Sequence, residues 1–424
     1  MTTTRDDTGQ LERQAERRPL WRNRDYLLLW CGQAISDIGG SVSELAFPLL
    51  VLAVTGSPAQ AGIVAALRTL PAVLVSLPAG ALIDRWNRKR VMLTCDIGRF
   101  LSLASIPLAL ALDHLTIYQL YITSFAEGTL ALLFNLAHTA SLGHVVAQEQ
   151  LSAAVAQDEV MEGTTALCGP SLSGLLFALG KTFPFLADAV SYAVSILTLL
   201  FIRTPFQGER KKTRPHLFAE LREGLFWMWR QPFIRSMTVF MGASAFSSSG
   251  SSLVVIVLAQ QRGATPFIIG CIFAFGGIGS IAGSLLAPFL EKRLTVGQSI
   301  LLCRWTFALF WPLYALMPLP LLMGLVEFSI GFADPIEDVP YFSYRLSLIP
   351  EELRGRVISA CRLFPGTLRP AGLFLTGLLL QRVGAVPTLL ISWLFLLLMA
   401  VLMTGNQHIR LATTTFRRKD SPLA

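Results

Sequence analysis

The chain has 424 residues, of which 53% are hydrophobic and only 15% are charged, and its formal net charge is +8. Soluble domains carry roughly 25% charged residues. The composition therefore excludes a cytosolic enzyme, a secreted domain and a disordered chain, and it indicates an integral membrane protein. In such a protein an excess of Lys and Arg marks cytoplasmic loops, so no nucleic-acid partner is expected. The six cysteines lie in apolar stretches without C-x-x-C spacing, which indicates neither a metal site nor a disulfide framework.

Twelve apolar segments are long enough to cross a bilayer, which takes roughly 20 residues each. Residues 1–25 are polar, carry six Arg and are expected to form a cytoplasmic tail. An N-terminal bundle, residues 26–203, is predicted to hold helices at 26–54, 60–83, 90–112, 115–141, 151–180 and 183–203. A C-terminal bundle, residues 233–404, is predicted to hold helices at 233–259, 265–290, 297–316, 319–346, 353–381 and 385–404. Residues 405–424 are expected to form a second cytoplasmic tail.

The longest polar stretch, residues 204–232, divides the chain near its middle. It begins as a linker and ends in an amphipathic stretch, 217–229, which is expected to lie as a helix on an anionic membrane surface rather than to bind a partner protein. The two halves share short matches at nearly one offset, such as Gly80-x-Leu82 and Gly283-x-Leu285. We therefore predict an all-α polytopic membrane protein with twelve transmembrane helices in two parallel six-helix repeats, and a site between the repeats near the bilayer midplane.

The distribution of basic residues predicts the orientation. If both termini are cytoplasmic, the loops and tails on that side hold 27 Lys and Arg, whereas the opposite loops hold three. Because basic residues accumulate on the cytoplasmic side of short loops, we expect a multi-pass protein of the plasma membrane with both termini in the cytoplasm.

The strongest motif is Gly80-Ala-Leu-Ile-Asp84-Arg85-Trp-Asn-Arg88-Lys89-Arg90, in the turn between the second and third predicted helices. Gly80 permits a close helix contact, and Asp84 is an anion placed to meet the positive N-terminal end of another helix. The motif resembles motif A of the major facilitator superfamily, G-x-L-x-D-R-x-x-R-K-R. The resemblance implies a loop that latches the two halves together in the outward-open state. The alternative is that its charges only anchor the loop at the cytoplasmic face.

The fifth predicted helix carries Gly163 and then Gly169-Pro170-Ser-Leu-Ser-Gly174. This pattern resembles the antiporter motif of the same superfamily, whose core is G-P-x-x-G-G, and the resemblance implies export. Ordinary close packing of small residues beside a proline kink is the alternative. In the fourth helix, drug exporters of the superfamily often carry R-x-x-Q-G where this chain has Ser124-Phe-Ala-Glu127-Gly128, so a proton mechanism that depends on that Arg is not transferred.

The resemblance extends from Trp21 to about Gly405, and it is closest to the branch that holds macrolide-efflux and enterobactin-exporter-like proteins. It implies the major facilitator fold, a small-molecule substrate, a lipid bilayer as surroundings and a monomer. The sequence contains no G-x-x-x-x-G-K-[ST] loop, so ATP is not the expected energy source. We expect a proton gradient to drive transport, without a cofactor.

Ionisable residues inside the predicted spans are candidates for the site, because a charge at mid-bilayer costs about 2.5–3.5 kcal/mol on insertion scales. Desolvation disfavours the charged form of a carboxylate, which suits reversible protonation. The candidate proton or substrate groups are Asp37, Glu44, Glu127, Asp158, Glu162, Asp334 and Arg369. A second set, nearer the cytoplasmic ends, is expected to form salt bridges between the halves: Asp96, Arg99, Glu337, Asp338, Arg345 and Arg362.

These features predict proton-coupled efflux of small amphipathic organic molecules, such as drugs, antibiotics or siderophores, by alternating access. The acidic excess at mid-depth favours neutral or cationic solutes. An importer or facilitator of the same fold stays open as an alternative. Asp334-Pro-Ile-Glu-Asp338 also fits the D-x-x-x-D of an intramembrane prenyltransferase, which would hold magnesium diphosphate. No second acidic motif accompanies it, so no enzyme activity is expected.

Overall fold

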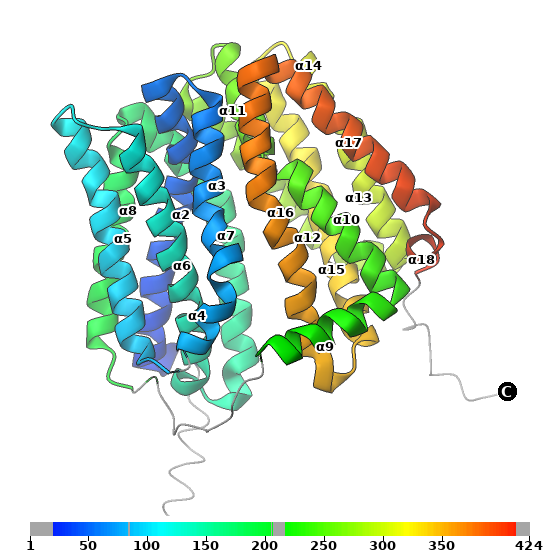
Figure 1. The fold of residues 1–424 in the computed structure, drawn as a ribbon, viewed down its shortest axis with the longest axis horizontal. Helices are drawn as coiled ribbons and strands as arrows, with labels where there is room; N and C mark the ends of the chain where they lie inside the picture. Colours follow the sequence, from blue (N-terminus) through cyan, green and yellow to red (C-terminus); the bar gives the residue numbers. More distant parts are fainter. Residues whose placement is uncertain (1–19, 84, 205, 207–216, 413–424) are drawn as a thin grey trace, which may run out of the picture.

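The structure is a computed structural model that describes residues 20–83, 85–204, 206 and 217–412. Within these residues the secondary structure is helical, without a β-strand. Figure 1 shows two groups of long helices that lie side by side, one from each half of the chain.

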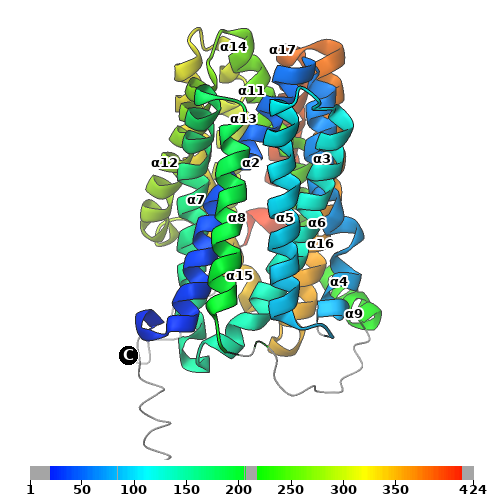
Figure 2. The same ribbon diagram turned by 90° about the vertical axis from the view of Figure 1, so that its left-hand side faces the viewer.

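The N-terminal group corresponds to the first six predicted spans. Its helices are α2 (Arg24–Thr55), α3 (Pro58–Leu74) with its continuation α4 (Ser76–Ile83), α5 (Arg88–Ala111), α6 (Ile117–Val145), α7 (Leu151–Leu179) and α8 (Phe183–Phe201). Figure 2 views this group from its outer side, with α5 and α8 in front.

The C-terminal group repeats this order after α9 (Leu217–Arg230), which matches the predicted amphipathic helix. Its helices are α10 (Pro232–Ser248) and α11 (Ser251–Gln261), α12 (Pro266–Glu291), α13 (Val296–Phe310) and α14 (Leu313–Leu316), α15 (Met323–Leu348), α16 (Arg354–Val383) and α17 (Ala385–Gly405), followed by α18 (Gln407–Arg410). Single turns of 3-10 helix, at 20–22, 148–150, 320–322 and 351–353, precede α2, α7, α15 and α16.

Nine helical segments in the described part of the chain are long and apolar enough to cross a membrane. Three further helices complete the predicted set: α3 has only 17 residues, and α7 and α15 carry several acidic residues. They are integral to the bundle, because α3 packs against α16 while α7 and α15 both pack against α12. The predicted all-helical, multi-span architecture is confirmed.

Side chains at the helix ends explain why the connections are short. The Asn23 side chain accepts a hydrogen bond from the backbone N–H of Tyr26 and starts α2, and Ser57 starts α3 in the same way. Gly56 ends α2 with a φ of 65°, a conformation that glycine adopts without strain. Each such cap contributes about 1 kcal/mol. The caps turn the chain back at once, so consecutive helices run antiparallel.

The two halves touch at the end of the bundle opposite the chain termini, which we call the closed end. Gly62 of α3 faces Gly377 of α16, and a Cβ added to Gly62 would lie 2.8 Å from the Gly377 Cα. Gly174 of α7 faces Gly270 of α12, and a Cβ on Gly174 would lie 2.9 Å from the Gly270 Cα. The backbones of the two halves are therefore in direct contact at both crossings, as small residues allow.

The buried apolar residues are distributed in the same way. One cluster, which includes Phe47, Phe185, Val255 and Tyr314, draws on both halves near the closed end. At the other end, which we call the terminal end, each half has its own cluster, around Phe134 in the N-terminal half and Met237 in the C-terminal half. The core is thus shared at the closed end and divided at the terminal end.

Candidate functional site

A cavity of about 680 Å³ lies within the N-terminal half. Its wall runs along residues 30–44 of α2, 135–142 of α6 and 155–165 of α7, and Arg68 of α3 and Arg99 of α5 complete it. These are the first parts of α2 and α7 and the last part of α6. The cavity therefore occupies the part of the bundle between the terminal end and the middle of the helices.

The lining of the cavity is acidic. Five carboxylates line it against two arginines, and one of these arginines is paired outside the cavity, as described below. The acids are Asp37, Glu44, Asp158, Glu159 and Glu162. The aromatic and apolar side chains of Trp30, Met161, Leu142 and Val155 line the same space, so the cavity presents apolar surface together with negative charge.

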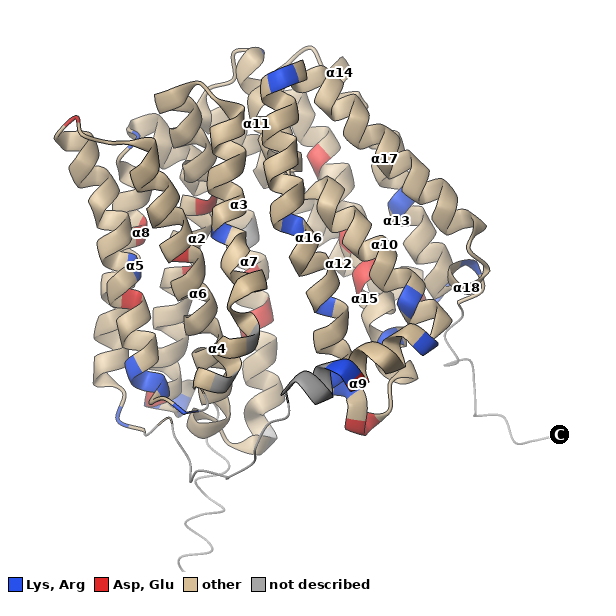
Figure 3. Cartoon of the chain, viewed as in Figure 1, with Lys and Arg blue, Asp and Glu red and all other residues tan. Residues whose placement is uncertain are grey.

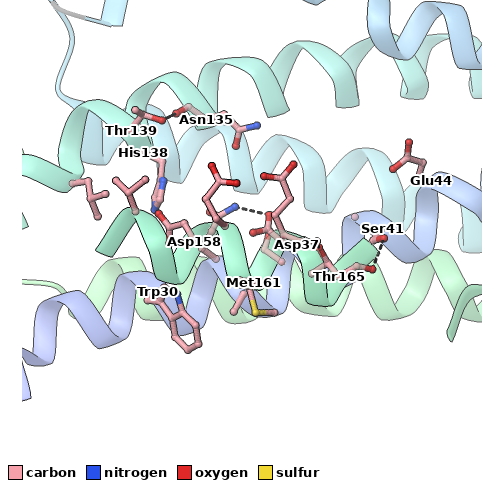
Figure 4. Close-up of a pocket in the computed structure, with 18 of the residues that line it drawn as sticks. Trp30, Asp37, Ser41, Glu44, Asn135, His138, Thr139, Asp158, Met161 and Thr165 are labelled. Atoms are coloured by element: carbon pink, nitrogen blue, oxygen red, sulfur yellow. Dashed lines mark hydrogen bonds between the residues drawn. The ribbon is translucent and has the colours of Figure 1, made fainter. Parts of the chain in front are cut away.

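Hydrogen bonds between side chains and backbone shape the wall. Gln33 lies one turn before Asp37 on α2, and its Nε2 donates to Asp37 Oδ1 at 2.6 Å. The Ser41 hydroxyl donates to the Thr165 carbonyl at 3.1 Å and joins α2 to α7. Figure 4 shows Asp37, Glu44 and Asp158 among the side chains around this space. Four sequence-predicted site residues, Asp37, Glu44, Asp158 and Glu162, thus share one cavity.

Glu127 lies behind the cavity wall and does not line it. Its side chain is fully buried, and Arg99 Nη2 lies 2.7 Å from Glu127 Oε1. The Tyr192 hydroxyl donates to the same oxygen at 3.0 Å, and the Arg99 guanidinium stacks 4.1 Å from the centre of the Tyr192 ring. Ser124 stands at the arginine position of the exporter motif on α6, and the arginine that contacts Glu127 comes from α5.

Two further carboxylates, Asp96 and Asp188, are completely buried near this pair. Ser195 donates to Asp96 Oδ2 at 2.6 Å, and Ser191 lies 3.3 Å from Asp188 Oδ1. The sequence interpretation did not single out Asp188. The available signal was the spacing of Asp188, Ser191 and Ser195, which places polar groups on one face of an otherwise apolar helix.

The C-terminal half contains a matching pair. Arg304 of α13 lies 2.5 Å from Glu337 of α15, and its guanidinium stacks over Phe307. These helices occupy the positions in the second repeat that α5 and α6 occupy in the first. The expectation that Arg99 and Glu337 bridge the two halves is therefore wrong for this conformation, because each finds its partner within its own half.

Asp334 and Arg369 lie away from the cavity. Both are exposed, on α15 and α16 of the C-terminal half, as are Asp338 and Arg362. Figure 3 shows that charged residues occur along the helices of both halves between the two ends of the bundle. The structure thus separates these two candidates from the acids of the cavity.

In the motif between α4 and α5, two basic residues contact other helices of the N-terminal half. Arg88 donates to the Ala140 carbonyl at 2.8 Å, and Lys89 donates to the Ile202 carbonyl at 2.6 Å. Both cations satisfy carbonyls near helix C-termini. Arg85 and Arg90 are exposed, and Asp84 lies outside the described residues. The close contact expected at Gly80 is not made, since no described atom lies within 4 Å of a Cβ placed there, and this turn lies at the terminal end.

The glycine motif of α7 makes contacts on two sides. A Cβ on Gly169 would lie 2.5 Å from the Ser41 Cβ of α2, so this glycine allows α2 and α7 to approach closely. The Pro170 carbonyl and Gly174 contact Gly270 of α12 in the other half. Gly163 has no described atom within 4 Å of its Cβ position. The motif therefore serves as a packing surface and as one of the two crossings at the closed end.

Comparisons with known proteins agree on a family. The model of a family described as transmembrane secretion effectors matches residues 18–417. The multidrug efflux pump Tap of Mycolicibacterium fortuitum is 26% identical over 397 residues, which cover 91% of this chain and 96% of Tap. Macrolide efflux protein A of Streptococcus pyogenes is 21% identical over 402 residues, which cover 92% of this chain and 97% of that protein.

The solved structures agree on the fold. A bacterial homologue of the iron transporter ferroportin in its inward-facing state gives a TM-score of 0.73 at 17% identity, and the match covers 92% of this chain and 99% of that chain. The same homologue in its outward-facing state gives a TM-score of 0.58 at 17% identity, and this match covers 89% of this chain and 98% of that chain. Both matches show that the chain has the fold of these transporters.

Proposed function

Because the chain belongs to the transmembrane secretion effector family of the major facilitator superfamily, we propose that it exports amphipathic organic cations from the cell in exchange for protons. The family and the relatives are transporters, so the chain is a membrane transporter and not an enzyme. The relatives are named as multidrug and macrolide efflux pumps, which supports the direction of transport.

The acidic cavity is the observation that supports the choice of substrate. Three more carboxylates than arginines line it, and Trp30, Met161 and Leu142 add apolar surface. A cation with an apolar body would gain attraction from the acids and burial against these side chains. An anion would be repelled from the same space.

The division of the core supports alternating access. In the proposed cycle the terminal end faces the cytoplasm, where the cavity takes up its substrate while the glycine crossings keep the closed end shut. The halves then separate at the closed end and approach at the terminal end, which releases the substrate outside. Protons move inward as the halves return, so the proton gradient drives export without a further cofactor.

Transport into inverted membrane vesicles tests this proposal, because the cytoplasmic side of the protein then faces the medium. With an acidic lumen, we expect accumulation of ethidium, a permanent cation, and of erythromycin, whose amine is protonated at neutral pH. We expect no accumulation of chloramphenicol, which is neutral. Nigericin, which collapses the pH gradient, should stop uptake of both cations, and vesicles without the protein serve as the background.

Two outcomes would contradict the proposal at different points. If chloramphenicol accumulates as well as ethidium, the acids of the cavity do not select by charge. If uptake of ethidium is unchanged by nigericin, export is not driven by protons.

A further inference from the structure

Asp188, near the start of α8, is a buried carboxylate that has no role in the transport cycle described above. Its side chain is 0% exposed, and Oδ1 lies 3.3 Å from the Ser191 hydroxyl. Oδ2 makes no hydrogen bond of regular geometry with the described residues, and the polar neighbour of the carboxyl group on α2 is the uncharged Ser43 hydroxyl. Glu127, by contrast, is held by Arg99 and Tyr192. Burial without a cationic partner disfavours a charged carboxylate and leaves a protonated one tolerated.

Asp188 lies directly against the cavity wall. A Cβ on Gly39 of α2 would lie 2.6 Å from Asp188 Oδ1, so the carboxyl group touches the backbone of α2. The adjacent Gly40 lines the cavity. Two consecutive residues without side chains therefore separate Asp188 from the substrate space, and a small shift of α2 would connect them.

Two arginines, Arg99 and Arg68, lie close enough to act on Asp188, and of these only Arg68 of α3 has no ion pair with a described residue. It lines the cavity, its Nη2 donates to the Gly40 carbonyl at 3.4 Å, and its Nη1 is buried without a hydrogen-bond partner among the described residues. Arg99 is committed to Glu127. The titratable groups around Asp188 and the adjacent cavity are Asp37 and Glu44 of α2, Arg68 of α3, Asp96 and Arg99 of α5, Glu127 and His138 of α6, Asp158, Glu159 and Glu162 of α7, and Tyr192 of α8.

We propose that Asp188 carries the proton exchanged for the substrate, that it is protonated in the conformation described, and that Arg68 becomes its counter-ion when the proton leaves. In that step the carboxyl O–H bond breaks, one proton passes to the cavity, and the carboxylate that remains pairs with the Arg68 guanidinium. A cationic substrate in the cavity also favours loss of the proton from Asp188, because it attracts the carboxylate that remains. By reciprocity, a proton on Asp188 weakens substrate binding. The inference rests on the proposed function, since it assigns a residue to its proton step.

Asp96 provides a matched control. It is also 0% exposed, it also accepts a hydrogen bond from a serine of α8, and one of its oxygens, Oδ1, also makes no hydrogen bond of regular geometry with the described residues. Asp188 differs in its contact with Gly39, one residue from the cavity lining. Only Asp188 should therefore exchange its proton with the substrate space.

The experiment compares Asp188→Asn and Asp96→Asn with the wild type in proteoliposomes, with ethidium as the probe. We expect Asp188→Asn still to exchange ethidium across the membrane in the absence of a gradient, but with a higher half-saturation concentration, because Asn imitates the protonated acid, which binds the cation less tightly. Accumulation driven by a pH gradient should fall about tenfold or more, the scale of a typical coupling between two sites. Asp96→Asn should retain both activities.

The outcomes separate the inference from the function on which it rests. If the wild type does not accumulate ethidium under a pH gradient, proton coupling itself fails. If the wild type does so and Asp188→Asn does too, or if only Asp96→Asn loses coupling, the assignment to Asp188 is overturned.

A second measurement uses the wild-type protein and does not depend on how the variants fold. Dicyclohexylcarbodiimide reacts with protonated carboxyl groups in apolar surroundings, and mass spectrometry locates the adduct. We expect an adduct on Asp188 that decreases when ethidium is bound. An adduct on Asp96 with none on Asp188, or labelling of Asp188 that ethidium does not change, would overturn the proposal.

Discussion

At the scale of single residues, the ion pair of Arg99 and Glu127 concentrates charge in the interior of the N-terminal half. Its carboxylate is fully buried, so removal of one partner leaves the other charge without compensation. Breaking a buried pair in this way costs about 3–5 kcal/mol, whereas replacing both partners is often nearly neutral. The pair therefore affects stability mainly when one partner is removed and the other charge stays buried without compensation.

We therefore expect Arg99→Met and Glu127→Gln each to lower the apparent unfolding temperature in detergent, and the double variant to be destabilised by less than the sum of the two. A double-mutant cycle from thermal unfolding measures this difference. The Arg304 and Glu337 pair offers a comparison in the other half, where the arginine side chain is more exposed, 17% against 9%, and the effects should be smaller. Additive effects of Arg99→Met and Glu127→Gln would show that the two side chains do not stabilise one another.

A variant of Asp37 measures how strongly the acids of the cavity attract a cation. Asp37 is held by Gln33 at 2.6 Å and lines the substrate space. We expect Asp37→Asn to raise the KM for ethidium about tenfold, which corresponds to ~1.4 kcal/mol of lost attraction. Asp338→Asn, an exposed acid outside the cavity lining, should leave the KM near the wild-type value. Equal shifts in both variants would indicate a general effect of charge rather than a contact in the cavity.

The sequence predicted part of this site because helical spacing is local. Asp158 and Glu162 are four residues apart, and the structure places both in the cavity. The pairing of Glu127 with Arg99 was not predicted, since it depends on how α5 and α6 pack and not on spacing along one helix. The offset of 205 residues between Arg99 and Arg304 fits the repeat and could have indicated the matched pairs.

At the scale of helices, glycines fix how closely the two halves approach. Gly174 and Gly163 lie on the same helix, but only Gly174 has backbone atoms of another helix within 3 Å of its Cβ position. The same substitution at these two positions should therefore have opposite effects.

We expect Gly163→Ala to stabilise the protein by about 0.4–1 kcal/mol, because alanine restricts the unfolded chain at no steric cost. Gly174→Ala should push α7 away from α12 and open the closed end. Thermal unfolding measures the first effect, and reaction of cysteines introduced near the Gly174 crossing with a water-soluble maleimide measures the second. Equal behaviour of the two variants would contradict the role assigned to the crossing.

The helix α9 shows where an amphipathic pattern is ambiguous. Its large apolar residues Leu225 and Trp229 are exposed, whereas Gly224 and Met228 are buried. Gly224 packs against the backbone of Arg356 on α16, and Glu223 forms an ion pair with Arg356 at 2.7 Å. The helix docks through a glycine that carries no hydrophobic signal, which leaves its apolar residues available for the membrane surface.

At the scale of the whole molecule, the twelve predicted segments and the observed helices agree within a few residues, because a bilayer requires long apolar runs. The interruptions between α3 and α4 and between α10 and α11 were not predicted. The relative placement of the halves could not be predicted either, since a transporter sequence must be compatible with more than one placement.

Orientation in the membrane can be tested by labelling. In a background without the six native cysteines, Lys181→Cys lies in the turn between α7 and α8 at the closed end, and Arg354→Cys lies at the start of α16 at the terminal end. We expect an impermeant maleimide to label Lys181→Cys in intact cells and Arg354→Cys only in inverted vesicles, as the Lys and Arg distribution indicates. The reverse pattern would place the terminal end outside the cell and contradict the proposed uptake of substrate from the cytoplasm.

The glycine crossings at the closed end have a consequence for how this gate responds to its surroundings. The contacts of Gly62 with Gly377 and of Gly174 with Gly270 carry no ionisable group, and the nearby side-chain hydrogen bond of Ser57 with Gln381 is also uncharged. When these crossings separate, the protein loses mainly dispersion contacts. Neither ionic strength nor pH changes the energy of those contacts directly. In the proposed cycle the charge changes that control opening therefore lie in the N-terminal bundle, whereas the glycine contacts at the closed end respond to neither salt nor pH.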